Sequence, residues 1–395
     1  MCAQIGAYTW PALLPGFIAE WHLTNREAGW ITGVFYAAYT LAVPILVTLT
    51  DRVDARKVYL AGVALTIASH LGFAVLADGF WGAAAARALA GVGWAGTYMT
   101  GLKLLADRVE PTLMSRAVAG HAASIGIAGA LSFVFAGALG QWLGWRGAFT
   151  AAGLAALAAW LVVFLWAPPR ERRAGGAPAG RLFDFRPVLR NRSAMAYALA
   201  YCAHTWEMNS LRGWGVAFLA YVVATTGAGR PWITPAVVAM TMGLVGTWAS
   251  VMGNEASIRL GRQRLVRLAM TTSMVCAAGI GFLGVHSYAL AAALVLIYGL
   301  LIWLDSSSLT AGAAGSADPV RRGATLALHS MAGYAGGFVG PIAIGWILDL
   351  AGGMSPLGWG LAFLHVGVIG LLGQLAFIVL APRDLAGDRS RAVAR

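Results

Sequence analysis

The sequence predicts an all-α polytopic membrane protein with twelve transmembrane helices in two six-helix bundles. The 395 residues are 59% hydrophobic and 11% charged, whereas a soluble domain carries about 25% charged residues. The chain also contains twelve apolar stretches separated by polar turns, and most of them approach the roughly 20 residues that a helix needs to cross a bilayer. This composition excludes an ordinary soluble enzyme, a disordered chain and a disulfide scaffold.

The twelve predicted spans follow one another along the whole chain. They cover residues 3–19, 29–50, 58–77, 80–106, 116–142, 147–167, 194–223, 235–253, 265–285, 288–314, 323–350 and 359–381. No basic segment precedes the first span, so we do not expect it to be a cleaved signal peptide.

Positive charge predicts the orientation of these spans. Of the 28 Lys and Arg residues, 22 lie in one set of alternate connections. The positive-inside rule places that set in the cytoplasm, so both termini are expected inside and the protein is expected in the plasma (inner) membrane. The net charge of +12 is therefore interpreted as a topology signal, and no nucleic-acid partner is expected.

The longest polar interval, 168–193, is rich in Pro, Gly and Arg and divides the spans six and six. We interpret it as a cytoplasmic linker. The predicted organisation is an N-terminal bundle over 1–167, the linker, a C-terminal bundle over 194–381 and a cytoplasmic tail over 382–395. The two halves echo each other at an offset of about 206 residues, and a monomer is expected.

Three short motifs stand out in this arrangement, and one of them, the basic turn, occurs in both halves. The turn after the second span of each half is basic, DRVDARK at 51–57 and RLGRQR at 259–264; the fourth span carries Arg87-x3-Gly91-x-Gly93; and GWRGAF at 144–149 precedes the sixth. Together with the six-plus-six spans, they resemble the major facilitator superfamily of secondary transporters over essentially the whole chain. The resemblance implies two bundles that rock about a central site lined by spans 1, 4, 7 and 10, giving alternating access.

The resemblance also implies a cytoplasmic gate formed by the basic turns. Asp51 would pair with basic groups across this gate and hold one conformation. Its expected members are Asp51, Arg52, Arg56, Arg259 and Arg262. The alternative is a solvated loop that only obeys the positive-inside rule.

Charged residues inside a span are costly and usually face a cavity. On a helical wheel of the fourth span, Trp94 and Tyr98 share the face of Arg87, which predicts a substrate-binding surface. The alternative is that Arg87 bonds to backbone carbonyls of neighbouring helices. Lys103 points away from this face and is expected to snorkel to the interface.

The seventh span carries the densest polar cluster, formed by Tyr201, His204, Glu207 and Arg212. Glu207, close to the predicted bilayer midplane, and His204, one turn away, are predicted to bind a coupling proton. Tyr201 and Arg212 are predicted to bind substrate. The alternative is a closed Glu–Arg or Glu–His pair that only fixes helix packing.

The tenth span contributes Asp305, followed by three serines. It is the second candidate for proton coupling. The alternative is a structural hydrogen bond to these serines or to neighbouring helices.

The prediction for function is a secondary active transporter, with proton-coupled uptake of a small organic anion preferred. The alternative is proton-coupled efflux of amphipathic or cationic compounds, although the fifth span lacks the Gly-Pro pair of drug/proton antiporters. A non-transporting membrane receptor is the candidate from a different class. No enzymatic activity, cofactor or metal site is predicted, and the expected partners are a small-molecule substrate, protons and the lipid bilayer.

Overall fold

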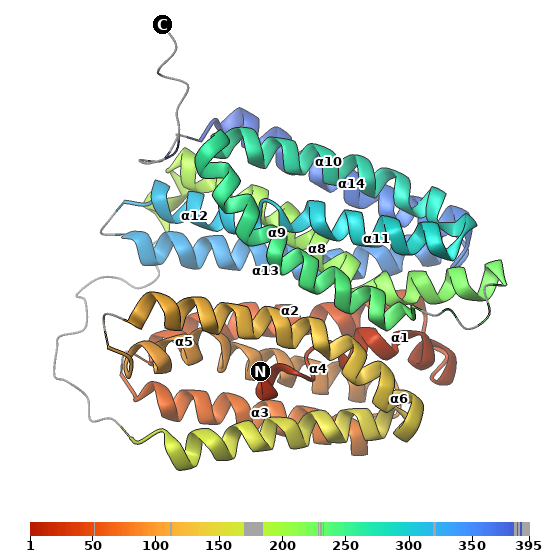
Figure 1. The fold of residues 1–395 in the computed structure, drawn as a ribbon, viewed down its shortest axis with the longest axis horizontal. Coiled ribbons are helices and arrows are strands. Elements are labelled where there is room, and N and C mark those ends of the chain that lie inside the picture. The colour runs from red at the N-terminus through yellow and green to blue at the C-terminus, as the bar shows by residue number, and fades with distance from the viewer. Residues whose placement is uncertain are drawn as a thin grey trace, which may run out of the picture. The chain divides into compact units, whose positions relative to one another are not determined.

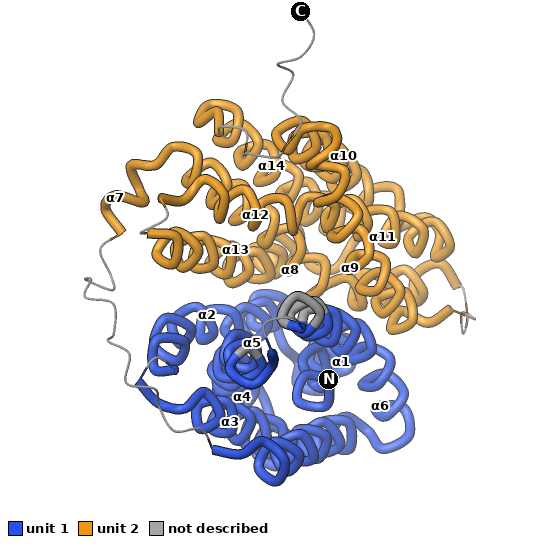
Figure 2. Tube along the Cα trace, turned by 60° about the vertical axis from the view of Figure 1, so that its left-hand side comes forward, with its two compact units in different colours: residues 1–180 blue, residues 181–395 orange. Residues whose placement is uncertain are grey.

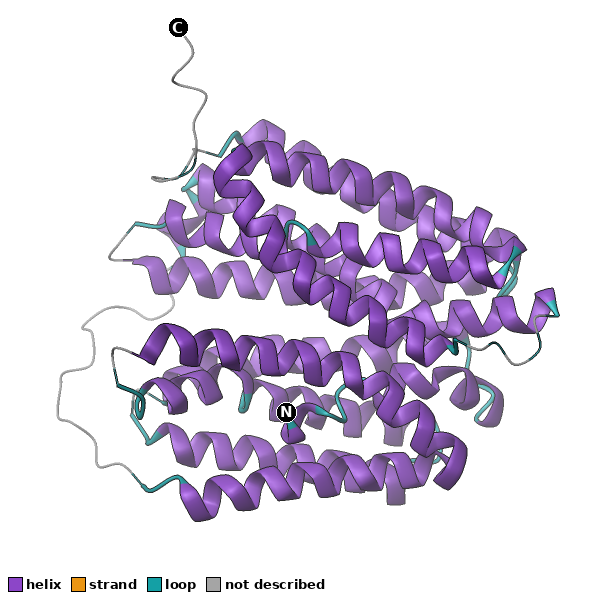
Figure 3. Cartoon of the chain, viewed as in Figure 1, coloured by secondary structure: helices purple, strands orange, loops and turns teal. Residues whose placement is uncertain are grey.

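The chain forms helices and connecting turns throughout the residues that the structure describes (Figure 3). This computed structural model describes residues 1–50, 52–110, 113–169, 185–227, 229, 231, 233–318, 321–382, 385 and 388. The helices of the first half are η1 (Cys2–Gln4), α1 (Thr9–Glu20), α2 (Asn25–Leu49), α3 (Ala55–Leu76), α4 (Phe80–Ala95), α5 (Tyr98–Ala106) and α6 (Met114–Trp166). Those of the second half are α7 (Arg186–Leu189), α8 (Arg192–Thr226), α9 (Pro235–Leu260), α10 (Arg262–Leu283), η3 (Gly284–His286), α11 (Tyr288–Trp303), α12 (Ser306–Ser316), α13 (Arg322–Leu350) and α14 (Pro356–Leu380).

The chain divides into two compact units, unit 1 (Met1–Gly180) and unit 2 (Arg181–Arg395), coloured separately in Figure 2. Within unit 1, α2 packs on α4, and α3 packs on α4 and α6. Within unit 2, α8 packs on α13, and α10 packs on α14. The boundary lies inside the interval 168–193 that the sequence predicts as a linker, while the exact predicted domain limits stay a prediction.

Matching breaks interrupt one predicted span in each unit. Span 80–106 consists of α4 and α5, and span 288–314 consists of α11 and α12, each pair separated by two residues. The starts of these helices correspond at an offset of 208 residues, as Phe80 and Tyr288 or Tyr98 and Ser306 show. The offset of about 206 predicted from the sequence is thus two residues short, and Asp305 corresponds to Thr97.

Helix α6 contains two predicted spans, 116–142 and 147–167. Its 53 residues would extend about 80 Å if straight, far more than the roughly 30 Å hydrocarbon core of a bilayer. Gly144 interrupts the helix with φ 68° and ψ 174°, a left-handed conformation that glycine adopts without a Cβ clash. The parts before and after Gly144 run in opposite directions in Figure 1, as two successive spans do.

Eight helices of the described residues are long and apolar enough to cross a membrane. This confirms the predicted class, an all-α polytopic membrane protein, although it matches the predicted count of twelve only in part. Each of the other predicted spans has a local reason to differ. Helix α1 has 12 residues and α4 has 16. Helix α6 contains two spans, and polar residues lower the hydropathy of α8.

Candidate functional site

Arg87 lies on α4, near the middle of unit 1, and its side chain is buried. Its Nη1 donates a hydrogen bond to the Ala7 carbonyl oxygen at 3.3 Å. Its guanidinium carbon lies 4.5 Å from the centroid of the Phe35 ring, a cation–π distance. None of the ion pairs among the described residues includes Arg87. The side chain therefore keeps a positive charge that no nearby carboxylate neutralises in this part of the chain.

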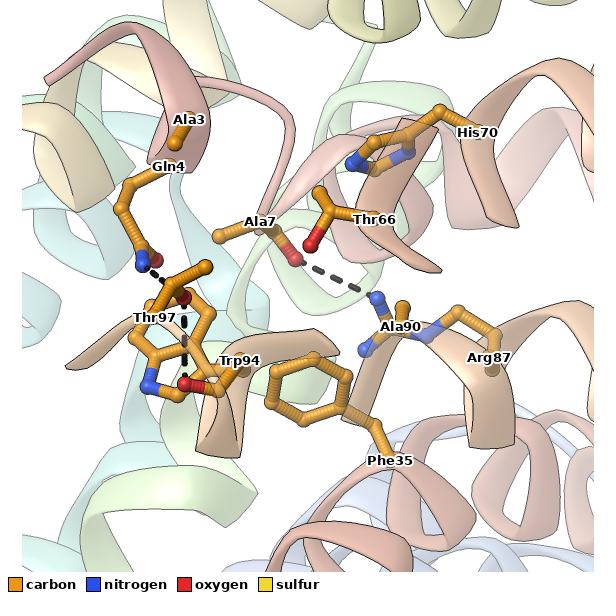
Figure 4. A pocket seen from close by; sticks show the side chains of 10 residues that line it. All are labelled: Ala3, Gln4, Ala7, Phe35, Thr66, His70, Arg87, Ala90, Trp94 and Thr97. Carbon is orange, nitrogen blue, oxygen red and sulfur yellow. Dashed lines mark hydrogen bonds between the residues drawn. The ribbon is translucent and has the colours of Figure 1, made fainter. Parts of the chain in front are cut away.

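A small pocket in unit 1 surrounds this guanidinium (Figure 4). Its polar lining comes from Gln4, Thr66, His70, Arg87 and Thr97, and its cavity volume is about 10 Å³. Gln4 donates from Nε2 to Thr97 Oγ1 at 2.9 Å. Gln4 Oε1, His70 Nδ1 and Arg87 Nε are buried and have no hydrogen-bond partner within the described residues. A cavity of this volume holds about one water molecule. A larger ligand could therefore bind only if side chains of the lining move.

The structure separates the predicted aromatic partners of Arg87. Trp94 lines the Arg87 pocket, whereas Tyr98 does not. The Tyr98 ring stacks instead on the imidazole of His121, with centroids 6.1 Å apart. The helical wheel assumed one continuous helix, but the chain breaks between α4 and α5, so residues after Gly96 no longer keep the phase of Arg87.

In unit 2, Glu207 and His204 lie on α8 and are both buried. Glu207 Oε2 accepts a hydrogen bond from Ser273 Oγ of α10 at 3.3 Å. His204 Nδ1 lies 2.9 Å from Oδ1 of Asp305, at the break between α11 and α12. The sequence predicted a Glu207–His204 unit, whereas the structure gives each of the two residues a partner on another helix.

The His204 imidazole belongs to a stack of three rings. The Tyr201 ring lies between His204 and His329, with centroid distances of 5.5 Å and 4.1 Å. His329 Nε2 lies 3.3 Å from Thr310 Oγ1. Tyr201 thus contacts the ring of a candidate coupling residue, and the structure adds His329 of α13 to this cluster.

Arg212, the other predicted substrate-binding cation, lies further along α8 and is half-buried. Its guanidinium carbon is 4.6 Å from the centroid of the Trp303 ring at the end of α11. Arg212 and Arg87 belong to different units.

The residues predicted to form a cytoplasmic gate have separate surroundings. Asp51 lies outside the described residues, and Arg52 is exposed. Arg56 donates from Nη2 to the Phe164 carbonyl oxygen at 2.7 Å. Arg259 pairs with Glu255 on the exposed surface of the same helix. Arg262 is buried and binds Asp388 of the predicted tail.

Asp54, an acid of the first basic turn that was not predicted as a gate residue, has a basic neighbour in the structure. Asp54 Oδ1 accepts a hydrogen bond from the Arg56 backbone N–H at 3.0 Å and so caps the start of α3. The same oxygen lies 3.6 Å from Nη2 of Arg108, just after α5. Position within a motif pointed to Asp51, which lies outside the described residues, so its predicted role stays a prediction.

No group of three or more His, Cys, Asp or Glu side chains able to hold a metal ion occurs in the part of the chain that the structure describes. The arrangement is instead two buried polar clusters. The Arg87 pocket carries positive charge, and the unit 2 cluster carries the carboxyl groups of Glu207 and Asp305. Such groups can bind charged solutes and protons inside a membrane protein.

These features define a polytopic helical membrane protein with a buried polar cluster in each unit. The chain belongs to the Major Facilitator Superfamily, because the model of that family matches residues 1–316. The family resemblance stated from the sequence motifs is thereby confirmed.

Two relatives illustrate the similarity in sequence. Protein spinster homolog 1 of Bos taurus is 25% identical over 287 residues, which are 69% of this chain and 54% of that protein. The probable sphingolipid transporter spinster homolog 1 of Arabidopsis thaliana is 30% identical over 160 residues, 40% of this chain and 32% of that protein. The chain therefore spans at most about half the length of these relatives.

Solved structures show the same fold. A bacterial homologue of the human lysosomal transporter Spinster, in an inward-facing and unoccupied conformation, superposes with a TM-score of 0.81 at 15% identity, over 99% of this chain and 96% of that chain. The nucleoside transporter NupG gives a TM-score of 0.75 at 13% identity, over 96% of this chain and 97% of that chain.

Proposed function

We propose that this transporter carries out proton-coupled uptake of a small organic anion by alternating access. One observation carries the proposal, the buried Arg87 guanidinium without a carboxylate partner in the described residues. Burial of an unpaired charge is costly, and an anion that reaches Arg87 would offset this cost. The unpaired Nε supplies a donor for a charge-assisted hydrogen bond to a carboxylate.

The coupling proton is proposed to bind in the unit 2 cluster. Glu207 and Asp305 are buried acids, and each has a polar partner on another helix. A carboxylate that gains a proton loses its charge, so its interaction with His204 or Ser273 changes during a transport cycle. Protonation can shift the equilibrium between two conformations of the transporter only by as much as the proton's binding free energy differs between them.

The second candidate is proton-coupled efflux of amphipathic or cationic compounds. The name of the Arabidopsis relative, a probable sphingolipid transporter, favours an amphipathic substrate. In this alternative, Glu207 or Asp305 binds the cationic part of the substrate, and aromatic side chains such as Trp94 contact its apolar part. A transporter with both termini in the cytoplasm, working as a monomer without a cofactor, is proposed in either case.

Transport into proteoliposomes tests the proposal. Purified protein is reconstituted, and uptake of radiolabelled carboxylates is measured with and without an inward proton gradient, with amphipathic cations as a second panel. The proposal expects gradient-driven accumulation of at least one carboxylate, abolished by a protonophore. Accumulation of cations against an opposing proton gradient, with no carboxylate transported, would support the efflux alternative and reject anion uptake.

A further inference from the structure

Arg262 is the residue of the second basic turn whose side chain is buried. It begins α10, and its side chain is 4% exposed. Nη1 donates to Asn254 Oδ1 of α9 at 3.1 Å and to the Ser308 carbonyl oxygen of α12, also at 3.1 Å. These contacts satisfy one end of the guanidinium fork, and the other end points to a residue far along the chain.

That residue is Asp388, which lies in the interval 382–395 predicted only as a tail. Arg262 Nε donates to Asp388 Oδ2 and Nη2 donates to Oδ1, both at 3.0 Å. The Asp388 side chain is 3% exposed. Two parallel N–H···O bonds of this kind are the strongest geometry for an arginine–carboxylate pair, and here water is almost excluded from both partners.

Two other described residues of this interval, Pro382 and Leu385, also contact helices of unit 2. Gln263 Nε2 donates to the Pro382 carbonyl oxygen at 2.7 Å. Leu385 packs on α12 at Gly315, where an added Cβ would lie 2.7 Å from its nearest carbon atoms. The contacts with unit 2 are thus a backbone hydrogen bond at Pro382, an apolar contact at Leu385 and an ion pair at Asp388.

We propose that Arg262, Asn254 and the Ser308 carbonyl form a carboxylate-binding site, and that the ligand of this site is the chain's own C-terminal segment. Without Asp388, the buried guanidinium would lose its counter-ion, since none of the other ion pairs among the described residues includes Arg262. Asp388 binds α10 and Leu385 contacts α12, and Arg262 extends the connection to Asn254 of α9. The segment therefore acts as an intramolecular latch on these three helices. This inference does not depend on the substrate or on the coupling ion.

Cysteine crosslinking tests the site in the 395-residue chain. The native cysteines Cys2, Cys202 and Cys276 are first replaced by serine. Leu385→Cys and Gly315→Cys then place two thiols at the observed contact, and the rate of oxidative crosslinking reports docking of the segment. The latch predicts rapid crosslinking, slowed by roughly tenfold or more in Asp388→Asn, which corresponds to a loss of at least about 1.4 kcal/mol.

Glu255→Gln is the matched control, because Glu255 is also a carboxylate paired with an arginine of the same region but is exposed. It should leave the crosslinking rate unchanged. A synthetic peptide of residues 382–395 in excess should compete with the segment and slow crosslinking, whereas the same peptide with Asp388→Asn should not. An unchanged rate in the Asp388→Asn chain, or equal competition by the two peptides, would reject the carboxylate site.

Discussion

The Arg87 guanidinium makes one long hydrogen bond and one cation–π contact. These two contacts offset only part of the cost of burying a cation. A backbone carbonyl at 3.3 Å is a weaker partner than a carboxylate at a shorter distance. The contact with Ala7 also agrees with the alternative interpretation that Arg87 bonds to neighbouring backbone. A packing role and a binding role differ in what happens when the charge is removed.

The first prediction concerns this charge. Arg87→Gln should weaken binding of the transported anion by about 1–3 kcal/mol, because a charged hydrogen bond is lost. Binding is measured by ligand-dependent thermal shift and by the KM of uptake. Lys103→Gln is the control, since Lys103 is a half-exposed cation already paired with Asp107 and should retain normal affinity. If the wild type and Arg87→Gln bind the anion with equal affinity, Arg87 has a packing role and does not bind substrate.

The second prediction concerns Glu207. Because glutamine cannot lose a proton, Glu207→Gln should still exchange substrate between equal internal and external pools but should no longer respond to an imposed pH gradient. Counterflow and pH-driven uptake are measured on the same proteoliposomes, with the exposed Glu255→Gln as the control. If Glu207→Gln keeps pH-driven accumulation while Asp305→Asn loses it, the coupling proton binds at the His204–Asp305 pair instead.

At the scale of single helices, close approach between α2 and α4 depends on a residue without a side chain. A Cβ added at Gly91 would lie 2.1 Å from the Phe35 carbonyl oxygen, so even alanine requires the two helices to separate. In the sequence this glycine is part of the motif Arg87-x3-Gly91-x-Gly93. The structure shows that it allows helix packing next to the Arg87 pocket.

The third prediction follows from this contact. Gly91→Ala should destabilise the protein by about 1–3 kcal/mol, the usual cost of overpacking, and should lower the melting temperature of the detergent-purified protein. Gly72→Ala on α3 is the matched control, because nothing lies within 4 Å of its added Cβ. That substitution should be neutral or stabilise the helix by about 0.5–1 kcal/mol. Equal melting temperatures of the two variants would contradict the packing role.

The helices themselves were largely predictable from the sequence, because long apolar stretches separated by charged turns have few other solutions in a membrane. Their interruptions were not. The breaks at Gly96–Thr97 and Leu304–Asp305 lie inside the predicted spans 80–106 and 288–314, each of which was treated as one continuous helix. Because a break changes the helical phase, Trp94 was predicted correctly as a neighbour of Arg87, whereas Tyr98 was not.

The contacts between buried polar residues of different helices could also not be predicted from the sequence. A helical wheel compares residues on one helix, so it grouped Glu207 with His204. The contacts of Glu207 with Ser273 and of His204 with Asp305 join helices 66 and about 100 residues apart in the chain. Only the packing of α8 on its neighbours determines which side chains meet.

At the scale of the whole molecule, the distribution of charge predicts how the chain crosses the membrane. The alternate connections that hold 22 of the 28 basic residues include the interval 168–193 and the C-terminal tail. Moving these segments across a bilayer during insertion is unfavourable, which is the physical basis of the positive-inside rule. The family and the helices leave this orientation open, so it needs a direct test.

The fourth prediction is that both segments lie in the cytoplasm. Fusions of green fluorescent protein after residue 180 and at the C terminus should be fluorescent in a bacterial host, whereas alkaline phosphatase at the same positions should be inactive. A fusion after residue 230, in a connection of the opposite set, should show the reverse pattern and serves as the control. Neutralising the seven arginines of 168–193 should increase the fraction of inverted molecules, because the charge bias between the two sides becomes smaller. Active phosphatase at both residue 180 and the C terminus of the unaltered chain would show that the charge bias does not set the orientation.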